Sequence, residues 1–336
     1  MRNAVFIGDW KGTAGNVYCQ SVREKLRGFL NFETDNVISK KELDEYKDIL
    51  SRAEYAFSTW GMPKFTREEI REYLPNIKAV FYAAGSVQGF AREFLEEDVE
   101  VFSAWAANAV PVAEYTFAEI MLATKGFFQR FHRQQLGNDW SHRGVPVSFP
   151  GNYESKIGII GAGMIGRLVI EKLKTLDKVA VLVYDLFLSD ERAAELGVTK
   201  VTLEELFEQC DVISNHVANN PQTVGMINGK HFKLMQPHAV FINTGRGAQV
   251  VEADMIEALR EVPTRVAVLD VTDPEPPLAD SPLYTLDNVF LTPHIAGSIG
   301  NEVHRMAEFM CEECKAYDAG EATRYSVSLK MLETMA

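Results

Sequence analysis

The feature that most limits how this chain can fold is a regular alternation that begins at Lys156. Short apolar runs, rich in β-branched residues, recur there with helical stretches between most of them. Strands that are apolar along their whole length are buried on both faces, which is typical of a parallel sheet covered by helices. The runs are Ile157–Ile160, Ala180–Tyr184, Val212–Ser214, Ala239–Ile242, Val266–Leu269 and Val289–Leu291. We therefore predict an α/β domain with a doubly wound parallel sheet.

The first hundred residues show a looser alternation and predict a second, smaller α/β domain. The expected strands are Ala4–Gly8, Tyr55–Trp60, Ala79–Tyr82 and Val99–Phe102. The expected helices are Tyr18–Phe29, Lys41–Ser51 and Thr66–Leu74.

Two long helices set the expected domain limits. A helical pattern over residues 111–135 begins at Pro111, with Glu114 in its first turn, which is a typical helix start. A last helix, about 301–319, follows the last strand and can carry the chain back to the first domain. We expect a discontinuous domain of residues 1–110 and 299–336, and a second domain of residues 111–298.

The polar segment after the first long helix, residues 136–151, predicts an irregular loop or arm. It contains Trp140 and Phe149. These two side chains are expected to pack either on a partner subunit or back on the same chain.

Composition excludes several classes of protein. The 34 basic and 47 acidic residues give a net charge of −13, which argues against binding to a nucleic-acid backbone. No apolar run reaches the ~18–20 residues of a membrane span. The N-terminus meets Asp9 almost at once, which does not fit a secretory signal, and four cysteines in 336 residues do not suggest a disulfide framework. We expect a cytoplasmic protein.

A glycine-rich turn follows the first apolar run of the larger domain and opens a helix. Gly161 allows a tight turn, Gly163 allows a pyrophosphate to approach the backbone, and Gly166 lets helix and strand pack closely. The helix N-terminus, at Met164 and Ile165, offers unpaired N–H groups to an anion. The sequence therefore predicts a dinucleotide site; the alternative is a tight turn without a ligand.

Asp185 ends the next apolar run, nineteen positions past Gly166. An acidic residue there accepts hydrogen bonds from the adenosine ribose hydroxyls and repels a 2′-phosphate. No arginine follows in Leu186, Phe187 and Leu188. We therefore predict that the cofactor is NAD rather than NADP.

Ionisable side chains follow several of the other strands, at the edge where parallel sheets bind ligands. Arg246 lies in a TGRG turn, where its guanidinium suits a carboxylate. His294 follows the last strand, and Glu275 in the DPEPP segment can pair with its imidazole and raise the histidine pKa. The alternatives are a solvent-facing loop arginine, a structural histidine and a solvated carboxylate.

His216 also ends a strand, and we expect it either to line the cofactor crevice or to be structural. The seven histidines show no metal-ligand spacing, so no metal is predicted. Cys311 and Cys314 form a single C-x-x-C within an expected helix, where packing is the favoured interpretation.

Taken together, these segments resemble the D-isomer-specific 2-hydroxyacid dehydrogenases, over roughly residues 75–310. The matching stretches are VAEYTFAEIML (112–122), GIIGAGMIGR (158–167), VYD (183–185), FINTGRG (241–247), LDVTDPEPPL (269–278) and LTPHIAGS (291–298). The resemblance implies a Rossmann cofactor domain, a smaller flavodoxin-like substrate domain and a homodimer.

The resemblance also implies roles for single residues. Arg246 binds the substrate carboxylate and polarises the 2-oxo group, His294 exchanges the proton, and Glu275 holds and charges His294. Asp270 positions the nicotinamide ring. The remaining implied contacts are Thr244, Gly245, Val217, Ala218 and Thr223 for the cofactor, and Gly85 and Ser86, through backbone N–H groups, for the substrate carboxylate.

The function predicted from these residues is hydride transfer between NAD(H) and a 2-oxo acid/D-2-hydroxy acid pair, mainly in the direction of reduction. One alternative is a non-enzymatic NAD(H)-sensing regulator or corepressor on the same fold. The second alternative is a methyltransferase built on the same sheet. That reaction has no evident use for Arg246, Glu275 and His294.

Overall fold

The computed structural model describes residues 1–131 and 149–333. The chain divides into two compact units: unit 1 is Met1–Ala109 with Ser298–Ala336, and unit 2 is Val110–Gly297. Each unit is an α/β body with its own seven-stranded sheet.

The sheet of unit 1 is parallel except at one edge. Its strands are β1 (Arg2–Ile7), β2 (Leu30–Asn31), β3 (Val37–Ile38), β4 (Tyr55–Ser58), β5 (Ala79–Tyr82), β6 (Glu100–Ser103) and β14 (Ser326–Val327). They lie in the order β14-β6-β5-β4-β1-β2, with β3 also paired to β1. Only β14, from the end of the chain, pairs antiparallel within this sheet as described. This is a flavodoxin-like order, in which the first strand lies inside the sheet.

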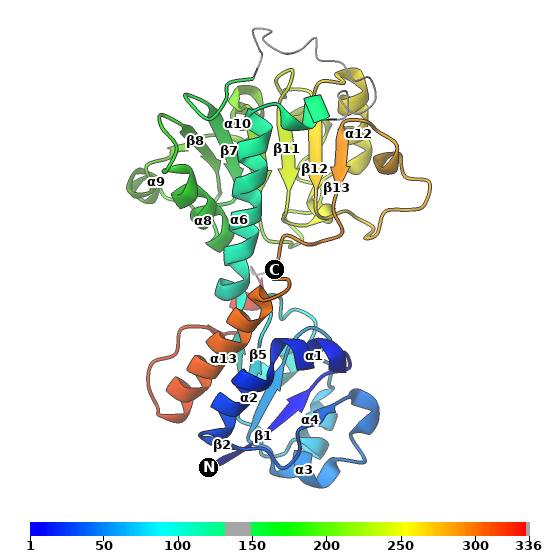
Figure 1. Ribbon diagram of the computed structural model, residues 1–336, viewed down its shortest axis with the longest axis vertical. Helices are drawn as coiled ribbons and strands as arrows, with labels where there is room; N and C mark the ends of the chain where they lie inside the picture. The colour runs from blue at the N-terminus through cyan, green and yellow to red at the C-terminus, as the bar shows by residue number, and fades with distance from the viewer. Residues whose placement is uncertain (132–148, 334–336) are drawn as a thin grey trace. The chain divides into compact units, whose positions relative to one another are not determined.

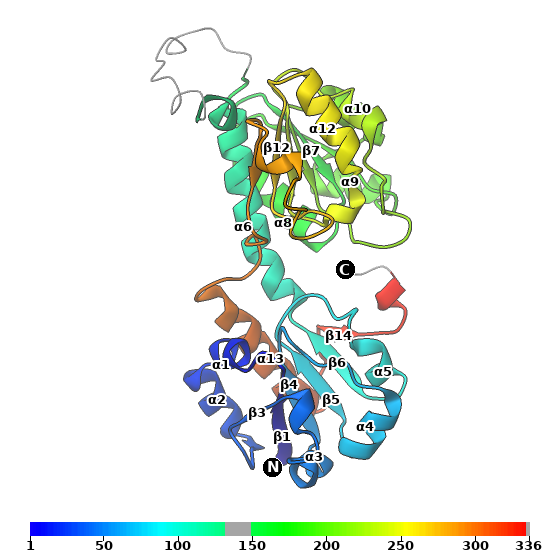
Figure 2. The same ribbon diagram turned by 90° about the vertical axis from the view of Figure 1, so that its right-hand side faces the viewer.

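Helices cover both faces of this sheet (Figures 1 and 2). They are α1 (Lys11–Val17), α2 (Gln20–Arg27), α3 (Lys47–Arg52), α4 (Arg67–Tyr73), α5 (Ala91–Leu95) and α13 (Glu302–Asp318), with 3-10 turns η1 (Lys40–Glu42) and η4 (Met331–Glu333). Figure 2 shows α1, α2 and α13 on one face and α4 and α5 on the other. Each face has its own apolar core. Local sequence sets where some of these helices begin. For example, Thr66 caps the N-terminus of α4 and forms a reciprocal capping box with Glu69.

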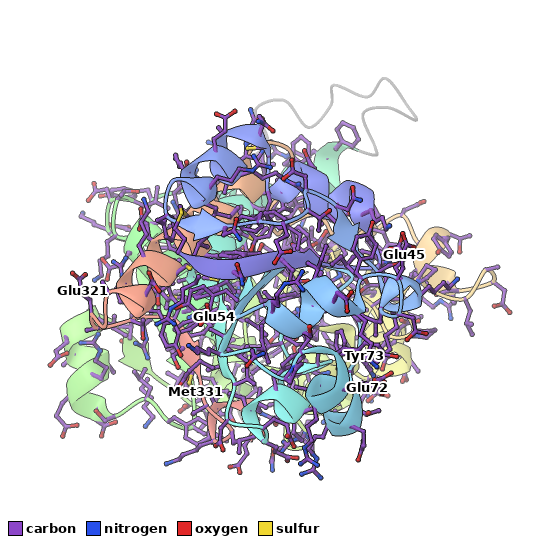
Figure 3. All side chains as sticks on the ribbon, turned by 90° about the horizontal axis from the view of Figure 1, so that it is seen from below. Glu45, Glu54, Glu72, Tyr73, Glu321 and Met331 are labelled. Atoms are coloured by element: carbon purple, nitrogen blue, oxygen red, sulfur yellow. The ribbon has the colours of Figure 1, made fainter. Side chains whose placement is uncertain are left out.

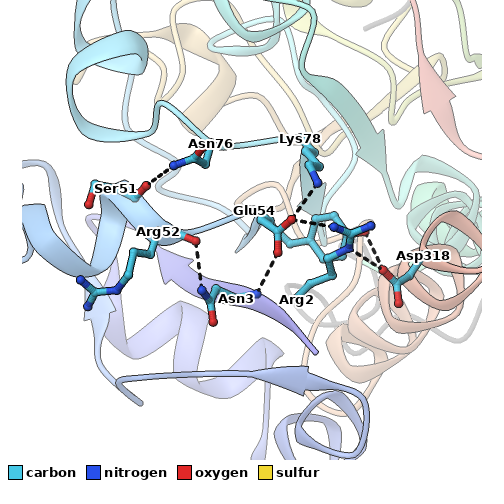
Figure 4. Close-up of polar contacts among 9 residues, drawn as sticks. Arg2, Asn3, Ser51, Arg52, Glu54, Asn76, Lys78 and Asp318 are labelled. Carbon is cyan, nitrogen blue, oxygen red and sulfur yellow. Dashed lines mark hydrogen bonds and ion pairs between the residues drawn. The ribbon is translucent and has the colours of Figure 1, made fainter.

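The returning C-terminal segment is tied to the start of the chain by charged side chains (Figure 4). Arg2 donates to Glu54 at 2.8 Å and to Asp318, the last residue of α13, at 3.3 Å. Lys78 donates to the same Glu54 carboxylate at 2.7 Å. Figure 3 shows Glu54 in the middle of this end of unit 1, with the exposed Glu45 and Glu321 on opposite sides of it.

The sheet of unit 2 is wholly parallel, with strand order β13-β12-β11-β10-β7-β8-β9. The strands are β7 (Lys156–Ile160), β8 (Ala180–Tyr184), β9 (Thr199–Lys200), β10 (Val212–Asn215), β11 (Val240–Asn243), β12 (Val266–Leu269) and β13 (Val289–Leu291). The chain runs outward from β7 to β9 and then resumes on the other side of β7 with β10. The direction of winding therefore reverses between β7 and β10, which is the Rossmann topology.

The helices of unit 2 also lie on two faces. They are α8 (Met164–Leu173), α9 (Asp190–Leu196), α10 (Leu203–Gln209), α11 (Gly229–Phe232) and α12 (Glu252–Glu261), with 3-10 turns η2 (Gly247–Gln249) and η3 (Pro282–Tyr284). One core joins the sheet to α8, α9 and the C-terminal part of α6 (Trp105–Thr124). The other joins it to α10, α11 and α12. The predicted fold class is confirmed.

Some expected elements are wrong in detail. Helix α6 begins at Trp105, six residues before the expected start, so Pro111 lies inside it. Pro111 lacks an N–H and removes one helical hydrogen bond beside the boundary between the units. The expected helix over 41–51 is instead η1 followed by the short α3. Within the described residues, no helix is both long enough and apolar enough to cross a bilayer.

Candidate active site

The glycine-rich turn lies between β7 and α8. Gly161 has φ +91°, a left-handed conformation that favours glycine. A Cβ on Gly166 would lie 2.0 Å from the Gly161 carbonyl oxygen, so only glycine allows this packing of helix on turn. Gly163 is different, because a Cβ there would meet no atom within 4 Å. It precedes Met164 and the uncapped start of α8, so the turn faces open space with the N–H groups of the helix beside it.

Asp185 follows β8 and holds this turn through its carboxylate. One oxygen accepts from the Ala162 N–H at 2.7 Å, and the other accepts from Phe187 N–H at 2.7 Å and Leu188 N–H at 3.1 Å. A carboxylate has about four acceptor positions, so one remains for a further donor such as a ribose hydroxyl. A pocket of about 650 Å³ lies beside it, with Asp185 and Leu186 in its lining.

The loop after β10 borders the same turn. His216 is buried; its Nε2 lies 2.9 Å from the Ser214 hydroxyl, while its Nδ1 has no hydrogen-bond partner among the described residues. Burial lowers the pKa of His216 to about 3, so the imidazole is neutral. Thr223 fixes this loop by donating to the Ala218 carbonyl at 2.7 Å. An unpartnered ring nitrogen, open space at Gly163 and the pocket beside Asp185 all fit a dinucleotide.

The turn that carries Arg246 is held by buried amides. Asn215 donates to Asn243 at 3.0 Å and to Gln249 at 2.6 Å, and Gln249 donates to the Val217 carbonyl at 2.7 Å. The Asn243 amide oxygen accepts the Gly245 N–H at 3.1 Å. The Thr244 hydroxyl lies 3.1 Å from that of Thr116 on α6. The three amides tie the loops after β10 and β11 into one frame.

The guanidinium of Arg246 is held on one side by the backbone and lies within the electrostatic reach of Glu275. It donates to the Gly245 carbonyl at 2.7 Å. Burial lowers the pKa of Arg246, and the negative charge of Glu275 opposes that effect, so the two side chains are close enough to interact. Gly247 makes this approach possible, because a Cβ there would lie 2.0 Å from the Thr272 carbonyl carbon on the segment that leads to Glu275.

Glu275 and His294 form a direct pair. The imidazole Nδ1 lies 2.7 Å from Glu275 Oε1, and both side chains are a little under half exposed. A carboxylate only accepts hydrogen bonds, so Nδ1 carries the proton and Nε2 is the nitrogen left for chemistry. His294 has φ +55°, a left-handed conformation that is unusual for a non-glycine residue.

The left-handed conformation of His294 is held by Asp270. It is buried, and its two oxygens accept from the Ile295 N–H at 2.8 Å, the Ala296 N–H at 2.9 Å and the Thr292 hydroxyl at 2.6 Å. Its carbonyl also accepts the His294 N–H at 3.0 Å. Asp270 therefore builds the turn that presents the imidazole.

The two remaining expected residues lie in unit 1, in the loop after β5. Gly85 is half-buried and Ser86 is exposed. The Ser103 hydroxyl donates to the carbonyls of Ala84 and Gly85, at 2.9 and 2.7 Å, and fixes the loop.

Within unit 2, the structure brings Arg246, Glu275 and His294 together and sets Asp270 behind His294. Sequence reasoning missed the buried amides Asn215, Asn243 and Gln249, and the close contact at Gly247. Their only signal in the sequence is the polar residue that ends β10 and β11, inside otherwise apolar runs.

Two other predictions fall at the edge of the described chain. Phe149 packs within unit 2, with its ring against His238 and the guanidinium of Arg130 over it. Trp140 lies outside the described residues.

The four cysteines are free thiols, and no group of three or more potential metal ligands occurs in residues 1–131 and 149–333.

The family model described as D-isomer specific 2-hydroxyacid dehydrogenase, NAD binding domain, matches residues 118–296, more than half of the chain. The chain belongs to the D-isomer-specific 2-hydroxyacid dehydrogenase family. Its cofactor is NAD, and the matched stretch includes the glycine-rich turn, Asp185 and all the residues gathered after the strands of unit 2.

Curated members of this family are similar over most of the chain. A D-3-phosphoglycerate dehydrogenase of Archaeoglobus fulgidus is 31% identical over 79% of this chain and 50% of its own length. A glyoxylate reductase of Korarchaeum cryptofilum is 31% identical over 75% of this chain and 76% of its own. The chain thus spans about half the length of the first relative. The NAD-complexed D-isomer specific 2-hydroxyacid dehydrogenase of Lactobacillus delbrueckii ssp. bulgaricus shares the fold, with TM-score 0.78 at 19% identity over 98% of this chain and 100% of that one.

Proposed function

We propose that this protein is an NAD-dependent D-2-hydroxyacid dehydrogenase that works mainly as a 2-oxo-acid reductase. The observation that supports this most is the grouping of a half-buried guanidinium with an imidazole–carboxylate pair at the carboxyl ends of β11, β12 and β13. These are the groups needed to bind an α-oxo carboxylate and to move one proton at its 2-oxygen.

Each of the three side chains has one task in this proposal. Arg246 binds the substrate carboxylate through its fixed fork of donors and meets the negative charge that develops on the 2-oxygen. Nicotinamide, when bound, supplies the hydride to C2 or accepts it. His294 gives its Nε2 proton to the 2-oxygen during reduction and takes it back during oxidation. Glu275 fixes the tautomer and orientation of His294, because its Oε1 lies 2.7 Å from the imidazole Nδ1.

The other expected contacts complete the proposal. We assign unit 2 as the cofactor domain and unit 1 as the substrate domain. The cofactor contacts proposed are Gly161, Gly163, Met164, Ile165, Gly166, Asp185, His216, Val217, Ala218, Thr223, Thr244, Gly245 and Asp270. Backbone N–H groups of Gly85 and Ser86 are assigned to the substrate carboxylate.

A panel of 2-oxo acids, assayed with NADH and with NADPH, tests the function. We expect steady NADH oxidation with at least one of glyoxylate, hydroxypyruvate, pyruvate or a branched 2-oxo acid, and slower turnover with NADPH. If NADH binds tightly but no 2-oxo acid is reduced, the protein is an NAD(H)-sensing regulator instead.

The proposal extends to assembly and compartment. Leu122 at the end of α6, and Phe127 and Phe131 in the helical segment that follows the next turn, are exposed apolar side chains, which supports a homodimer. Four free thiols support a reducing, cytoplasmic setting. Sedimentation analysis of the full chain tests the proposed homodimer, since a monomer at micromolar concentration contradicts it.

A further inference from the structure

The loop after β5 offers hydrogen-bond donors while its acceptors are already occupied. Within residues 1–131 and 149–333, the N–H groups of Gly85 and Ser86 donate to no acceptor. The carbonyl oxygens beside them are used, because the Ser103 hydroxyl shares its proton between those of Ala84 and Gly85. A stretch of backbone with free N–H groups and occupied carbonyls favours an anion.

Ser103 also fixes the direction of both N–H groups, through the planarity of the peptide bond. In a trans peptide the C=O and N–H bonds point in opposite directions. The described chain has cis bonds only in the DPEPP segment, so the peptides on either side of Gly85 are trans. Their carbonyls point at the Ser103 hydroxyl, at distances of 2.9 and 2.7 Å, so the N–H groups of Gly85 and Ser86 point away from it. One hydroxyl therefore orients both donors.

Ser103 is in turn held by the C-terminal segment of the chain. It is fully buried and is the last residue of β6. Its backbone N–H donates to the Tyr325 carbonyl at 3.1 Å, just before β14 begins. Strand β6 lies between β5 and β14 in the sheet (Figure 2). The hydroxyl is thus placed between the loop after β5 and the returning chain.

The far end of the loop is fixed to the same C-terminal segment. Gln88 Nε2 donates to the Leu332 carbonyl at 2.7 Å. Leu332 lies in η4, is buried, and belongs to the same apolar core as Ala84 and Val87. The loop is therefore anchored both before and after its free N–H groups.

We propose that Ser103 is a positioning residue for substrate binding, because its hydroxyl directs the N–H groups of Gly85 and Ser86 at the substrate carboxylate, while Gln88 and the C-terminal segment hold the loop. This rests on the proposed function, in which those N–H groups bind that carboxylate. Prealigned donors bind without first having to be ordered. The carboxylate keeps its charge during hydride transfer, so its binding energy is the same before and during the reaction. Loss of the Ser103 hydroxyl therefore raises KM and leaves kcat nearly unchanged.

Ser103→Ala tests this proposal, with Ser58→Ala as its matched control. The two serines are both fully buried, end β6 and β4, and lie opposite Tyr82 on either side of β5. The Ser58 hydroxyl, however, donates to the Ile7 carbonyl at 2.6 Å, outside the loop. Each variant loses one buried hydroxyl, so their Tm values should fall to a similar extent.

The kinetic comparison uses NADH and the 2-oxo acid that the unchanged protein reduces fastest. Only Ser103→Ala should raise KM for the acid, by about tenfold, with kcat and the Kd for NADH changed less than about twofold. Equal KM values in Ser103→Ala and Ser58→Ala overturn the proposal.

A variant of an exposed residue keeps the test independent of the core. Gln88→Met removes the donor to the Leu332 carbonyl, and KM for the 2-oxo acid should rise by about fivefold. Gln20→Met removes another exposed glutamine of unit 1, which donates to Glu24 on α2, and should leave KM unchanged. If Gln88→Met behaves as Gln20→Met, the proposal is overturned.

A binding measurement without turnover separates this proposal from the proposed function. Oxalate carries carboxylates but no 2-oxo group, and calorimetry follows its binding to the full chain saturated with NADH. We expect Ser103→Ala to bind oxalate at least about fivefold more weakly than Ser58→Ala, even if no 2-oxo acid is reduced. Oxalate that binds both variants equally, or that does not bind the unchanged protein, overturns the proposal.

Discussion

Replacing Gly166 by alanine tests whether the packing of α8 on the glycine-rich turn builds the cofactor site. The new Cβ would lie 2.0 Å from the Gly161 carbonyl oxygen, whereas real Cβ contacts essentially never fall under 3.0 Å. Helix and turn must therefore separate by about 1 Å, because the atom in the way belongs to the backbone and cannot rotate aside. Overpacking of this kind costs about 2–3 kcal/mol, which lowers the Tm of a unit of this size by roughly 5–10 °C.

Gly163→Ala is the matched control, because its Cβ would meet no atom within 4 Å and its φ is −69°. Its stability should change by less than about 0.5 kcal/mol. Its methyl group nevertheless enters the space offered to a pyrophosphate, so the Kd for NADH should rise at least about tenfold. Calorimetry and NADH fluorescence titration measure the two quantities. Equal Tm values for the two variants, or unchanged NADH binding in Gly163→Ala, would refute this account of the turn.

Three further substitutions test single roles. Arg246→Lys keeps the charge but loses the two-point fork of donors. KM for the 2-oxo acid should therefore rise at least about tenfold, while the Kd for NADH changes less than about twofold. A loss confined to NADH binding contradicts the role of Arg246 in binding the substrate carboxylate. His294→Gln should lower kcat by about 10²–10⁴-fold with unchanged Tm and NADH binding, and substantial residual turnover would exclude it as the proton donor. Asp185→Ser should shift the NAD-to-NADP preference by about tenfold or more, measured as the ratio of kcat/KM values, and a constant ratio contradicts the ribose contact.

Much of unit 2 could be predicted from sequence because its strands are apolar along their whole length. The limits of β8 and β12 agree with the expected runs Ala180–Tyr184 and Val266–Leu269. When strands and helices alternate in this way, the strand–helix–strand connections are right-handed and the strands are parallel. The position of the glycine-rich turn then shows at which edge of the sheet the polar residues that follow the strands lie together. The pairing of Glu275 with His294 could therefore be anticipated, although nineteen residues separate them.

The errors come from features that local patterns do not encode. Pro111 fits the pattern of a first helical residue, but tertiary packing continues α6 back to Trp105. Helix α1 was missed because two glycines interrupt its short sequence. The amide frame at Asn215, Asn243 and Gln249 was missed because buried amides and loop amides look alike in sequence, and only the fold pairs their donors with acceptors.

Glu119 is a buried acid of α6, and its Oε2 has no hydrogen-bond partner among the described residues, so it makes the stability of the fold depend on pH. Burial raises the pKa of Glu119 from its ordinary 4.5 to about 8, so between these values the folded chain holds a proton that the unfolded chain has lost. The contribution is therefore complete below pH 4.5 and is lost as pH rises toward 8. The shift corresponds to a loss of about 2–4 kcal/mol once relaxation around the buried charge is allowed for.

Glu119→Gln removes this titration and leaves the others in place. The difference in unfolding free energy between the variant and the unchanged protein should therefore grow in favour of the variant, by about 2–4 kcal/mol from pH 5 to pH 9. Urea unfolding at a series of pH values measures that difference, and contributions from other groups, such as neutral His216, cancel in it. Glu114→Gln, on the exposed side of α6, should show no such growth. A difference that stays constant from pH 5 to pH 9 would mean that Glu119 is already charged in the folded protein at pH 5, and the effect assigned here to its burial would then be wrong.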